Sequence, residues 1–232
     1  MGFLEKYNSG QTLLIDKDLD WTSFDVVKKL KILIKCKKVG HAGTLDPLAT
    51  GLLIICTGKN TKKINDIQNL RKVYTGEFII GKTTPSHDLE TEFTTNNEVI
   101  EINEKKLEKV RKTFLGEQLQ RPPKFSAVKV DGKRAYQYAR DNINVEIKEK
   151  NINIYDFIIT EVSTPNISFE ITCSKGTYIR SIARDFGERL NCGAVLSKLR
   201  RTKIGEYDVK NASRIDILVE KIKKEKIENS KG

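Results

Sequence analysis

The chain has 232 residues, 38% of them hydrophobic and 31% charged, and its 42 lysines and arginines against 31 acidic residues give a net charge of +11. That length suits one large globular domain or two small ones. No apolar run approaches the roughly 20 residues that span a bilayer, and residues 1–15 lack a secretion signal, which predicts a cytoplasmic protein with no membrane partner. The positive charge favours a polyanionic partner, although a lysine-rich proteome would shift the count in the same direction.

The four cysteines are Cys36, Cys56, Cys173 and Cys192, and no two of them form a CxxC pair. Three of them lie within apolar-patterned segments. The sequence therefore predicts reduced thiols in the core rather than disulfides or a metal site.

The first predicted elements are a strand over residues 11–16 and a helix that Thr22 or Ser23 caps. Apolar residues recur on one face of this helix from Val26 to Ile34, and lysines crowd the other face and the helix exit. The lysines are Lys28, Lys29, Lys31, Lys35, Lys37 and Lys38. They form either a solvated face or a set of phosphate contacts, and the pattern leaves both interpretations open.

Residues 39–51, VGHAGTLDPLATG, place His41 and Asp46 among three glycines. One interpretation is structural: Asp46 caps a one-turn helix that begins at Pro47 and stops at Gly51. The other is functional, because a capping aspartate at a loop–helix junction is well placed to project into a cleft. The two interpretations are compatible. The apolar run that follows, residues 52–56, predicts a buried strand or the end of a short helix.

Residues 72–80 alternate as a strand that carries Tyr74. Residues 76–83 formally match the P-loop pattern GxxxxGK[ST], but three of the four intervening residues are bulky and apolar. A P-loop needs a flexible glycine-rich loop that opens a helix, so we predict no nucleoside triphosphate site here. The next residues, 83–97, are polar and rich in turn formers, which places His87 on a surface loop.

An amphipathic helix is predicted over residues 104–115. The pattern then changes, because Pro122-Pro123 interrupts regular structure and Asp131-Gly132 suits a tight turn. Basic residues alternate with aromatic ones as far as Arg140. Residues 119–150 are therefore either an arm that grips RNA or an ordinary basic hairpin.

The last third predicts strands over residues 151–162 and 167–173, then a helix that Gly176-Thr177 opens. Apolar residues form one stripe of that helix from Ile179 to Leu190. A strand is expected near residues 205–209, and an amphipathic, lysine-rich helix begins at Ile215.

Several of these segments resemble motifs of one family. GHAGTLDPLATGLL, residues 40–53, is similar to the motif around the catalytic aspartate of the TruB family of tRNA pseudouridine synthases. Three more similarities follow in family order: Lys72-Val73-Tyr74, the GTYIRS of residues 176–181, and residues 191–201 with their CGA and LRR segments. DKDLDWTSFDVV, residues 16–27, resembles the opening motif, with Asp18 in place of its usual proline.

The resemblance runs from about residue 11 to residue 210 and implies an architecture. We expect an α/β (α+β type) pseudouridine synthase fold, with a mixed, mostly antiparallel central sheet and flanking helices. The catalytic domain is expected over residues 1–213, with the arm of residues 119–150 inside it. Residues 214–232 are expected to be a basic tail, without the PUA domain that many relatives carry.

The resemblance also implies a reaction: isomerisation of uridine 55 in the T-loop of tRNA to pseudouridine, with no cofactor, metal or guide RNA. The base must be flipped out of its stack to be reached. The T-arm of tRNA is the expected partner, and the enzyme is expected to act as a monomer. A non-catalytic chaperone of the tRNA elbow and a general RNA-binding module are the alternatives, and only the enzyme needs a reactive aspartate.

Each expected site residue has a role by resemblance. Asp46 is the catalytic carboxylate, through attack at C6, attack at C1′ or removal of a sugar proton, and Arg180 opposes the rise in pKa that burial would cause. Tyr74 stacks on the target base and assists proton removal at C5. The other expected substrate-binding residues are His41, which fills the space left by the flipped base, Tyr178, Leu199 and Lys17.

Overall fold

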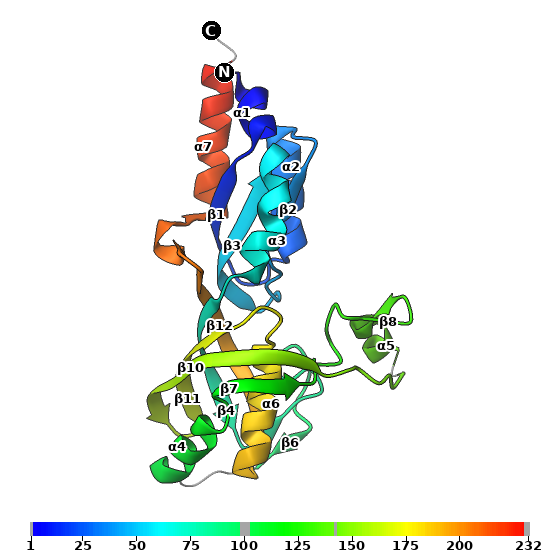
Figure 1. Cartoon of the computed structure of the whole chain (residues 1–232), viewed down its shortest axis with the longest axis vertical. Coiled ribbons are helices and arrows are strands. Elements are labelled where there is room, and N and C mark those ends of the chain that lie inside the picture. Colours follow the sequence, from blue (N-terminus) through cyan, green and yellow to red (C-terminus); the bar gives the residue numbers. More distant parts are fainter. Residues whose placement is uncertain (1, 98–102, 142, 230–232) are drawn as a thin grey trace. The chain divides into compact units, whose positions relative to one another are not determined.

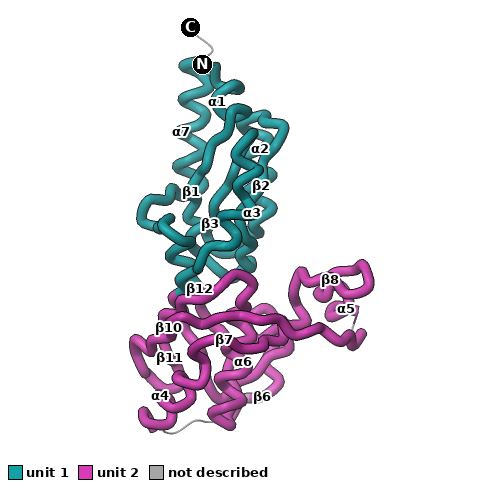
Figure 2. Tube along the Cα trace, viewed as in Figure 1, with its two compact units in different colours: residues 1–74, 200–232 teal, residues 75–199 magenta. Residues whose placement is uncertain are grey.

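The computed structural model describes residues 2–97, 103–141 and 143–229, so residue 142 of the expected arm and residues 230–232 of the expected tail lie outside the described residues. The chain folds into two compact units (Figure 2). Unit 1 comprises residues 1–74 and 200–232, and unit 2 comprises residues 75–199. The chain passes between the units within strand β4 (Lys72–Ile80) and within strand β12 (Ala194–Ile204).

Unit 1 contains a sheet in the order β14-β1-β3-β12, in which β1 is antiparallel to β3 and parallel to β14 (Figure 1). Short β2 pairs with β3, and β13 with β12. Its remaining elements are α1 (Phe3–Ser9), β1 (Thr12–Lys17), α2 (Ser23–Ile34), β2 (Val39–His41), β3 (Ala49–Thr57), the 3-10 helix η1 (Gly58–Lys63), α3 (Ile64–Asn69), β13 (Tyr207–Asp208), the 3-10 helix η2 (Val209–Asn211), β14 (Ser213–Arg214) and α7 (Ile215–Glu228).

Strand β3 forms the core of unit 1. Leu52, Ile54 and Cys56 are fully buried and pack with Ile67 and Ile204. The apolar run in this segment is therefore a central strand, which is one of the two predicted alternatives. The structure also confirms the strand at residues 11–16.

Helix α2 begins as its sequence predicts. Thr22 is the N-cap, its side chain accepts a hydrogen bond from the Asp25 amide at 3.0 Å, and the Thr22 amide donates to the Asp25 carboxylate at 3.1 Å. This reciprocal arrangement satisfies two amides that the first helical turn leaves without partners. The apolar face is buried and the six lysines named above are exposed.

The C-terminal helix α7 packs against the rest of unit 1. It buries Ile215, Leu218, Val219 and Ile222, and Glu225 accepts from the Lys6 ammonium of α1 at 2.6 Å. In Figure 1 this helix (red) runs beside α1 and β1.

Unit 2 has the strand order β12-β4-β11-β10-β7. The pairs β10–β11 and β10–β7 are antiparallel. Helices α6 and α4 lie beside the strands of this sheet (Figure 1). Its other elements are β5 (Lys82–Thr83), β6 (Thr95–Asn96), α4 (Glu104–Lys112), β7 (Gly116–Gln120), β8 (Lys129–Val130), β9 (Lys133–Arg134), α5 (Ala135–Arg140), β10 (Lys150–Ser163), β11 (Asn166–Cys173) and α6 (Ile179–Leu190).

Five phenylalanines form the core of unit 2. Phe78 and Phe169 stack with ring centroids 4.2 Å apart, and Phe114, Phe157 and Phe186 surround them. These rings come from β4, β10, β11, α6 and the turn after α4, so the cluster fixes the helices on the sheet.

The P-loop similarity is accidental, as predicted. Residues 76–80 belong to β4, and the segment continues into β5 rather than into a helix. A Cβ on Gly76 would lie 2.4 Å from the Lys198 carbonyl oxygen and 2.6 Å from the Phe169 ring, so this glycine permits the close approach of neighbouring strands.

Two expected boundaries are wrong. Residues 46–49 form a turn, with the Ala49 amide donating to the Asp46 carbonyl at 3.0 Å, and no one-turn helix follows. Gly51 lies inside β3 with φ of 100°, where a Cβ would meet the Arg201 carbonyl oxygen at 2.3 Å. Strand pairing has therefore overridden the local capping signal. Helix α4 ends at Lys112 rather than at residue 115, and a turn leads to Gly116 with φ of 90°.

The arm of residues 119–150 contains the hairpin that the Asp131-Gly132 pair predicts. Strands β8 and β9 are antiparallel, and the two turn residues have φ of 48° and 84°. The fold is thus mixed α/β with a largely antiparallel sheet, as expected. None of the helices in the described parts of the chain is long and apolar enough to cross a membrane.

Candidate active site

The expected site residues are distributed over both units. Lys17, His41, Asp46 and Tyr74 belong to unit 1, and Tyr178, Arg180 and Leu199 belong to unit 2. Each unit therefore presents its own set of side chains.

Asp46 lies in the loop of residues 42–48 that connects β2 to β3, and we refer to this segment as the Asp46 loop. The Asp46 side chain is partly exposed. The preceding residue is fixed from α2, because the Ser23 hydroxyl accepts from the Leu45 amide at 2.8 Å and donates to the Leu45 carbonyl at 3.2 Å. A helix N-terminus thus sets the backbone next to the aspartate.

Lys17 holds the same loop from β1. Its side chain is 1% exposed, and its ammonium donates to the carbonyls of Asp18 at 2.9 Å, Trp21 at 2.7 Å and Pro47 at 3.3 Å. An ammonium has three N–H donors, so all three have backbone acceptors in this arrangement. Burial lowers the pKa of Lys17 to about 8, and the charge of Asp46 is the largest effect that opposes this.

A second buried cation, Arg201, holds the loop from β12. It is 1% exposed, and its guanidinium donates to the carbonyls of Leu52 at 2.8 Å, Gly43 at 3.1 Å and Thr44 at 3.3 Å. The LRR segment contains this arginine, but nothing in the local pattern assigns it to a loop some 150 residues earlier.

His41 is the last residue of β2 and is partly buried. Burial is the main reason that its pKa lies below the ordinary value, and the positive charge of Arg201 acts in the same direction. The ring is therefore neutral at physiological pH, which suits stacking against a base. Tyr74 is 9% exposed and lies on β4.

In unit 2, Arg180 lies in the first turn of α6 and is 4% exposed. Its Nε is 3.5 Å from a carboxylate oxygen of Asp88, which is also buried, and its Nη1 donates to the Ser86 carbonyl at 3.4 Å. Asp88 was missed by sequence reasoning. It is one of several acidic residues in a polar segment, and only the fold shows which of them faces the arginine.

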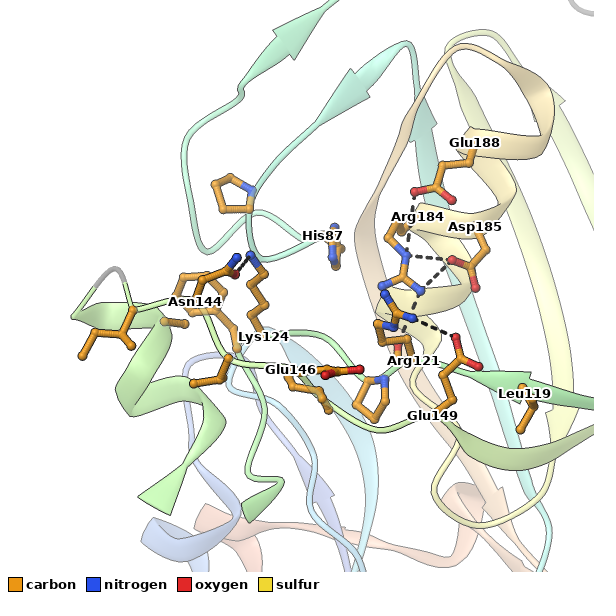
Figure 3. A pocket seen from close by; sticks show the side chains of 17 residues that line it. His87, Leu119, Arg121, Lys124, Asn144, Glu146, Glu149, Arg184, Asp185 and Glu188 are labelled. Atoms are coloured by element: carbon orange, nitrogen blue, oxygen red, sulfur yellow. Dashed lines mark hydrogen bonds and ion pairs between the residues drawn. The ribbon is translucent and has the colours of Figure 1, made fainter. Parts of the chain in front are cut away.

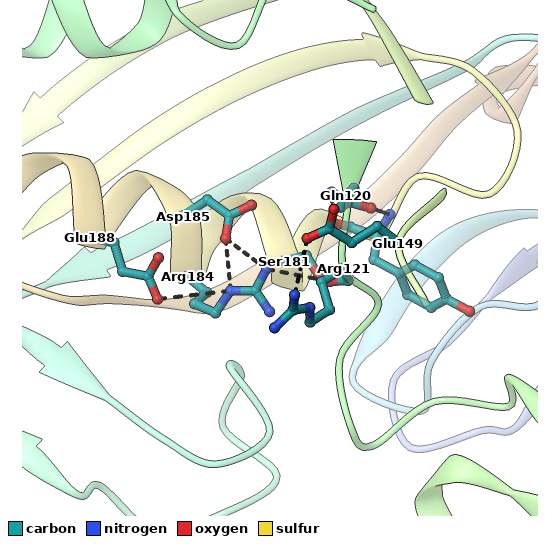
Figure 4. Close-up of polar contacts among 8 residues, drawn as sticks. Gln120, Arg121, Glu149, Ser181, Arg184, Asp185 and Glu188 are labelled. Carbon is teal, nitrogen blue, oxygen red and sulfur yellow. Dashed lines mark hydrogen bonds and ion pairs between the residues drawn. The ribbon is translucent and has the colours of Figure 1, made fainter. Parts of the chain in front are cut away.

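The start of α6 is held by the end of β7. The Gln120 side chain accepts from the Tyr178 amide at 2.8 Å and donates to the Tyr178 carbonyl at 3.1 Å. The Ser181 hydroxyl donates to the Arg121 carbonyl at 2.8 Å (Figure 4). Gln120 is buried. The two-way amide contact fixes the backbone of Tyr178, the residue that precedes the helix.

A cleft of about 1180 Å³ separates the arm of residues 119–150 from the rest of unit 2 (Figure 3). Its walls carry the cations Arg121, Lys124 and Arg184, together with the aromatic residues Phe125 and His87. Carboxylates also line it, and the Nη2 atom of Arg184 is 2.7 Å from the Oδ1 atom of Asp185.

His87 lies in a loop, as predicted, but it is partly buried and lines this cleft rather than the open surface. The polar composition of residues 83–97 concealed this, because composition reports average exposure and not which side chain turns inward.

Comparison with known proteins identifies the family. The sequence profile of the TruB family pseudouridylate synthase N-terminal domain matches residues 31–179, and that of the tRNA pseudouridylate synthase B C-terminal domain matches residues 180–231. The tRNA pseudouridine synthase B of Flavobacterium johnsoniae is 54% identical over 225 residues, which cover 94% of this chain and 98% of that protein. The same-named protein of Chloroherpeton thalassium is 47% identical over 220 residues, covering 93% and 91%.

Among solved structures, a chain of a Cbf5-Nop10-Gar1 complex superposes with a TM-score of 0.71 at 27% identity, covering 94% of this chain and 56% of that chain. A chain of an H/ACA RNP bound to a substrate RNA containing 2′-deoxyuridine gives a TM-score of 0.70 at 24% identity and covers 55% of that chain, which supports the fold. The present chain thus spans little more than half of these solved chains. The profile matches and the identity to full-length relatives show that the chain belongs to the TruB family of pseudouridylate synthases, which are isomerases.

Proposed function

We propose that this protein converts uridine 55 in the T-loop of tRNA to pseudouridine, as a monomeric, cytoplasmic enzyme that needs no guide RNA. The observation that carries the proposal is the 54% identity to a tRNA pseudouridine synthase B over 98% of that protein's length. The isomerisation of uridine to pseudouridine in tRNA follows from family membership. The position of the uridine and the role of each residue are proposed.

The proposed reaction rearranges bonds without net consumption of any reagent. The N1–C1′ bond of the uridine breaks, the uracil turns, and C5 forms a new bond to C1′. The C5 proton leaves and N1 gains a proton, so atoms and charge balance. A positioned carboxylate and a closed binding pocket are the main requirements of this chemistry.

We propose Asp46 as that carboxylate. Support comes from the hydrogen bonds that hold the backbone of the Asp46 loop in place. They come from Ser23 of α2, Lys17 of β1 and Arg201 of β12. Lys17 is proposed to act through this loop, since its three donors are engaged with carbonyls. This replaces the expectation that Lys17 contacts the substrate.

The other proposed roles follow the family motifs. Arg180 favours the ionised carboxylate, and Asp88 orients the guanidinium. Tyr74 stacks on the target base and assists proton removal at C5. The remaining residues proposed to contact the flipped nucleotide or fill its place are His41, Tyr178 and Leu199.

The arm of residues 119–150 is proposed to grip the T-arm. The cleft beside it is lined by three cations, by aromatic side chains and by the four carboxylates of Glu146, Glu149, Asp185 and Glu188. Cations beside rings on which bases can stack are the combination that binds single-stranded nucleic acid. The exposed lysines of α2 offer further phosphate contacts.

The test is to incubate the purified protein with unmodified tRNA transcript and map pseudouridine. Asp46→Asn keeps the size of the side chain and removes its charge, so it is expected to abolish product while tRNA still binds. Asp66→Asn, an exposed aspartate in α3, is the matched control and should retain activity. Turnover by Asp46→Asn would remove the aspartate from the mechanism. Binding without turnover by the wild type would favour the tRNA-chaperone alternative.

A further inference from the structure

The loop that precedes Asp88 holds His87 in an unusual backbone conformation. His87 has φ of 63°, in the left-handed region that glycine occupies most readily. The conformation is fixed on both sides, because the His87 amide donates to the Thr84 carbonyl at 3.2 Å and its carbonyl accepts from the Leu196 amide at 3.0 Å. A side chain kept at a strained position is a feature found at functional sites.

The His87 side chain lies at the cleft between the arm and α6. Figure 3 shows it between Lys124 on one wall and Arg184 on the other. The ring therefore forms part of the cleft wall between these two cations.

The ring has the chemistry of a base contact rather than of a phosphate contact. Burial lowers the pKa of His87 to about 4, and the positive charges of Arg184, Arg180 and Lys124 act in the same direction. At physiological pH the imidazole is therefore uncharged, with one nitrogen donor and one nitrogen acceptor. The neighbouring cations suit the phosphates, whereas a flat neutral ring suits a nucleobase by stacking or by a hydrogen bond.

We infer that His87 contacts a nucleobase of the substrate RNA within this cleft. The inference rests on the proposed function, since it takes RNA as the ligand of the cleft. It adds a recognition residue in residues 83–97, which lie outside the motifs that carry the family resemblance.

The experiment measures RNA binding and stability together. The probe is a fluorescent T-arm stem-loop, and the variants are His87→Gly, His87→Asn and His87→Phe. Glycine removes the ring and relieves the backbone, so the melting temperature should stay equal or rise while Kd rises at least tenfold. If the Kd of His87→Phe stays close to the wild-type value, the ring stacks on the base. If the Kd of His87→Asn stays close to the wild-type value, the ring forms a hydrogen bond with the base. Either result supports the base contact.

Three results would overturn the inference. The Kd of His87→Gly could match the wild type, which means that the ring touches no RNA. Its melting temperature could fall, which means that the ring holds the loop. The slope of log Kd against log salt could drop by about one unit, which indicates a phosphate contact. Pseudouridine formation by the wild type is measured in parallel, so a failure of the proposed function is seen separately from a failure of this binding inference.

Discussion

Replacing Arg201 by methionine should loosen the Asp46 loop from inside unit 1. Methionine keeps an unbranched apolar stem and removes the guanidinium that donates to the carbonyls of Gly43, Thr44 and Leu52. Arg201 is 1% exposed, so water does not readily replace these donors.

The change in the free energy of unfolding caused by Arg201→Met combines a loss of hydrogen bonds with the removal of a buried charge. Each carbonyl left without a donor costs about 1–3 kcal/mol, and the 3.3 Å bond to Thr44 contributes least. Removing the charge also removes the cost of burying it, which is several kcal/mol before its hydrogen bonds are counted. We therefore expect a net loss of about 2–4 kcal/mol in the free energy of unfolding. Arg201→Lys should recover only part of this, because an ammonium cannot reproduce the planar fork.

Urea unfolding measures the stability, and steady-state kinetics on tRNA transcript measure the effect on the site. We expect kcat to fall at least tenfold while KM changes less than threefold, because the loop position and not RNA affinity is altered. The adjacent Arg200 provides a matched control. It pairs with Asp16 at 2.7 Å on a partly exposed surface, so Arg200→Met should cost less than about 1 kcal/mol. The reasoning is refuted if Arg201→Met unfolds within 0.5 kcal/mol of the wild type and keeps its kcat (roughly the scatter of surface substitutions).

Three further outcomes are expected. Asp88→Asn removes the negative charge of a buried carboxylate 3.5 Å from the Arg180 Nε, so it should lower the unfolding free energy by about 3 kcal/mol and reduce kcat, both measured by the same two assays. The pKa of His87 is about 4 in the folded state and near 6.5 in the unfolded chain, so the unfolded chain binds a proton more readily between these values. The unfolding free energy of the wild type, relative to that of His87→Gly, should therefore fall as the pH drops from 6.5 to 4. Urea unfolding at several pH values measures this difference, and a difference that does not change with pH contradicts the prediction. Replacing the arm cations Lys129, Lys133 and Arg134 by alanine should lower the salt slope of RNA binding by about one unit for each lost phosphate contact, and an unchanged slope would mean an ordinary hairpin.

Local sequence signals were sufficient for most elements. The alternation over residues 72–80 matches β4, and Thr22, one of the two predicted capping residues, is the N-cap of α2. Such signals depend on neighbours within one turn or one strand. They failed at residues 46–51, where the Asp-Pro pair favours a helix but strand pairing imposes a turn and then β3. A local preference of about 1 kcal/mol cannot outweigh the burial of a whole central strand.

Distant contacts had no such signal. Backbone carbonyls accept the hydrogen bonds of Lys17 and Arg201, and every residue has a carbonyl, so no residue type marks the acceptors. Gly51 is similar, because its need for φ of 100° and for space beside Arg201 becomes visible only when β12 is placed against β3. Asp88 required the fold to distinguish it from the other acidic residues of its segment.

The way in which the Asp46 loop is held has a consequence for where rate-altering substitutions should occur. Two elements that are neighbours in the sequence, β1 and α2, and a third some 150 residues later, β12, each supply one side chain that binds the backbone of the Asp46 loop. The loop position is therefore set by the assembly of unit 1, and no segment around residue 46 can fix it alone. Because catalysis is sensitive to displacements of about 1 Å, stability and rate should be coupled at Ser23, Lys17 and Arg201 and uncoupled at exposed positions such as Asp66. A positioned carboxylate is thus a property of the whole unit, even though the motif that identifies it is local.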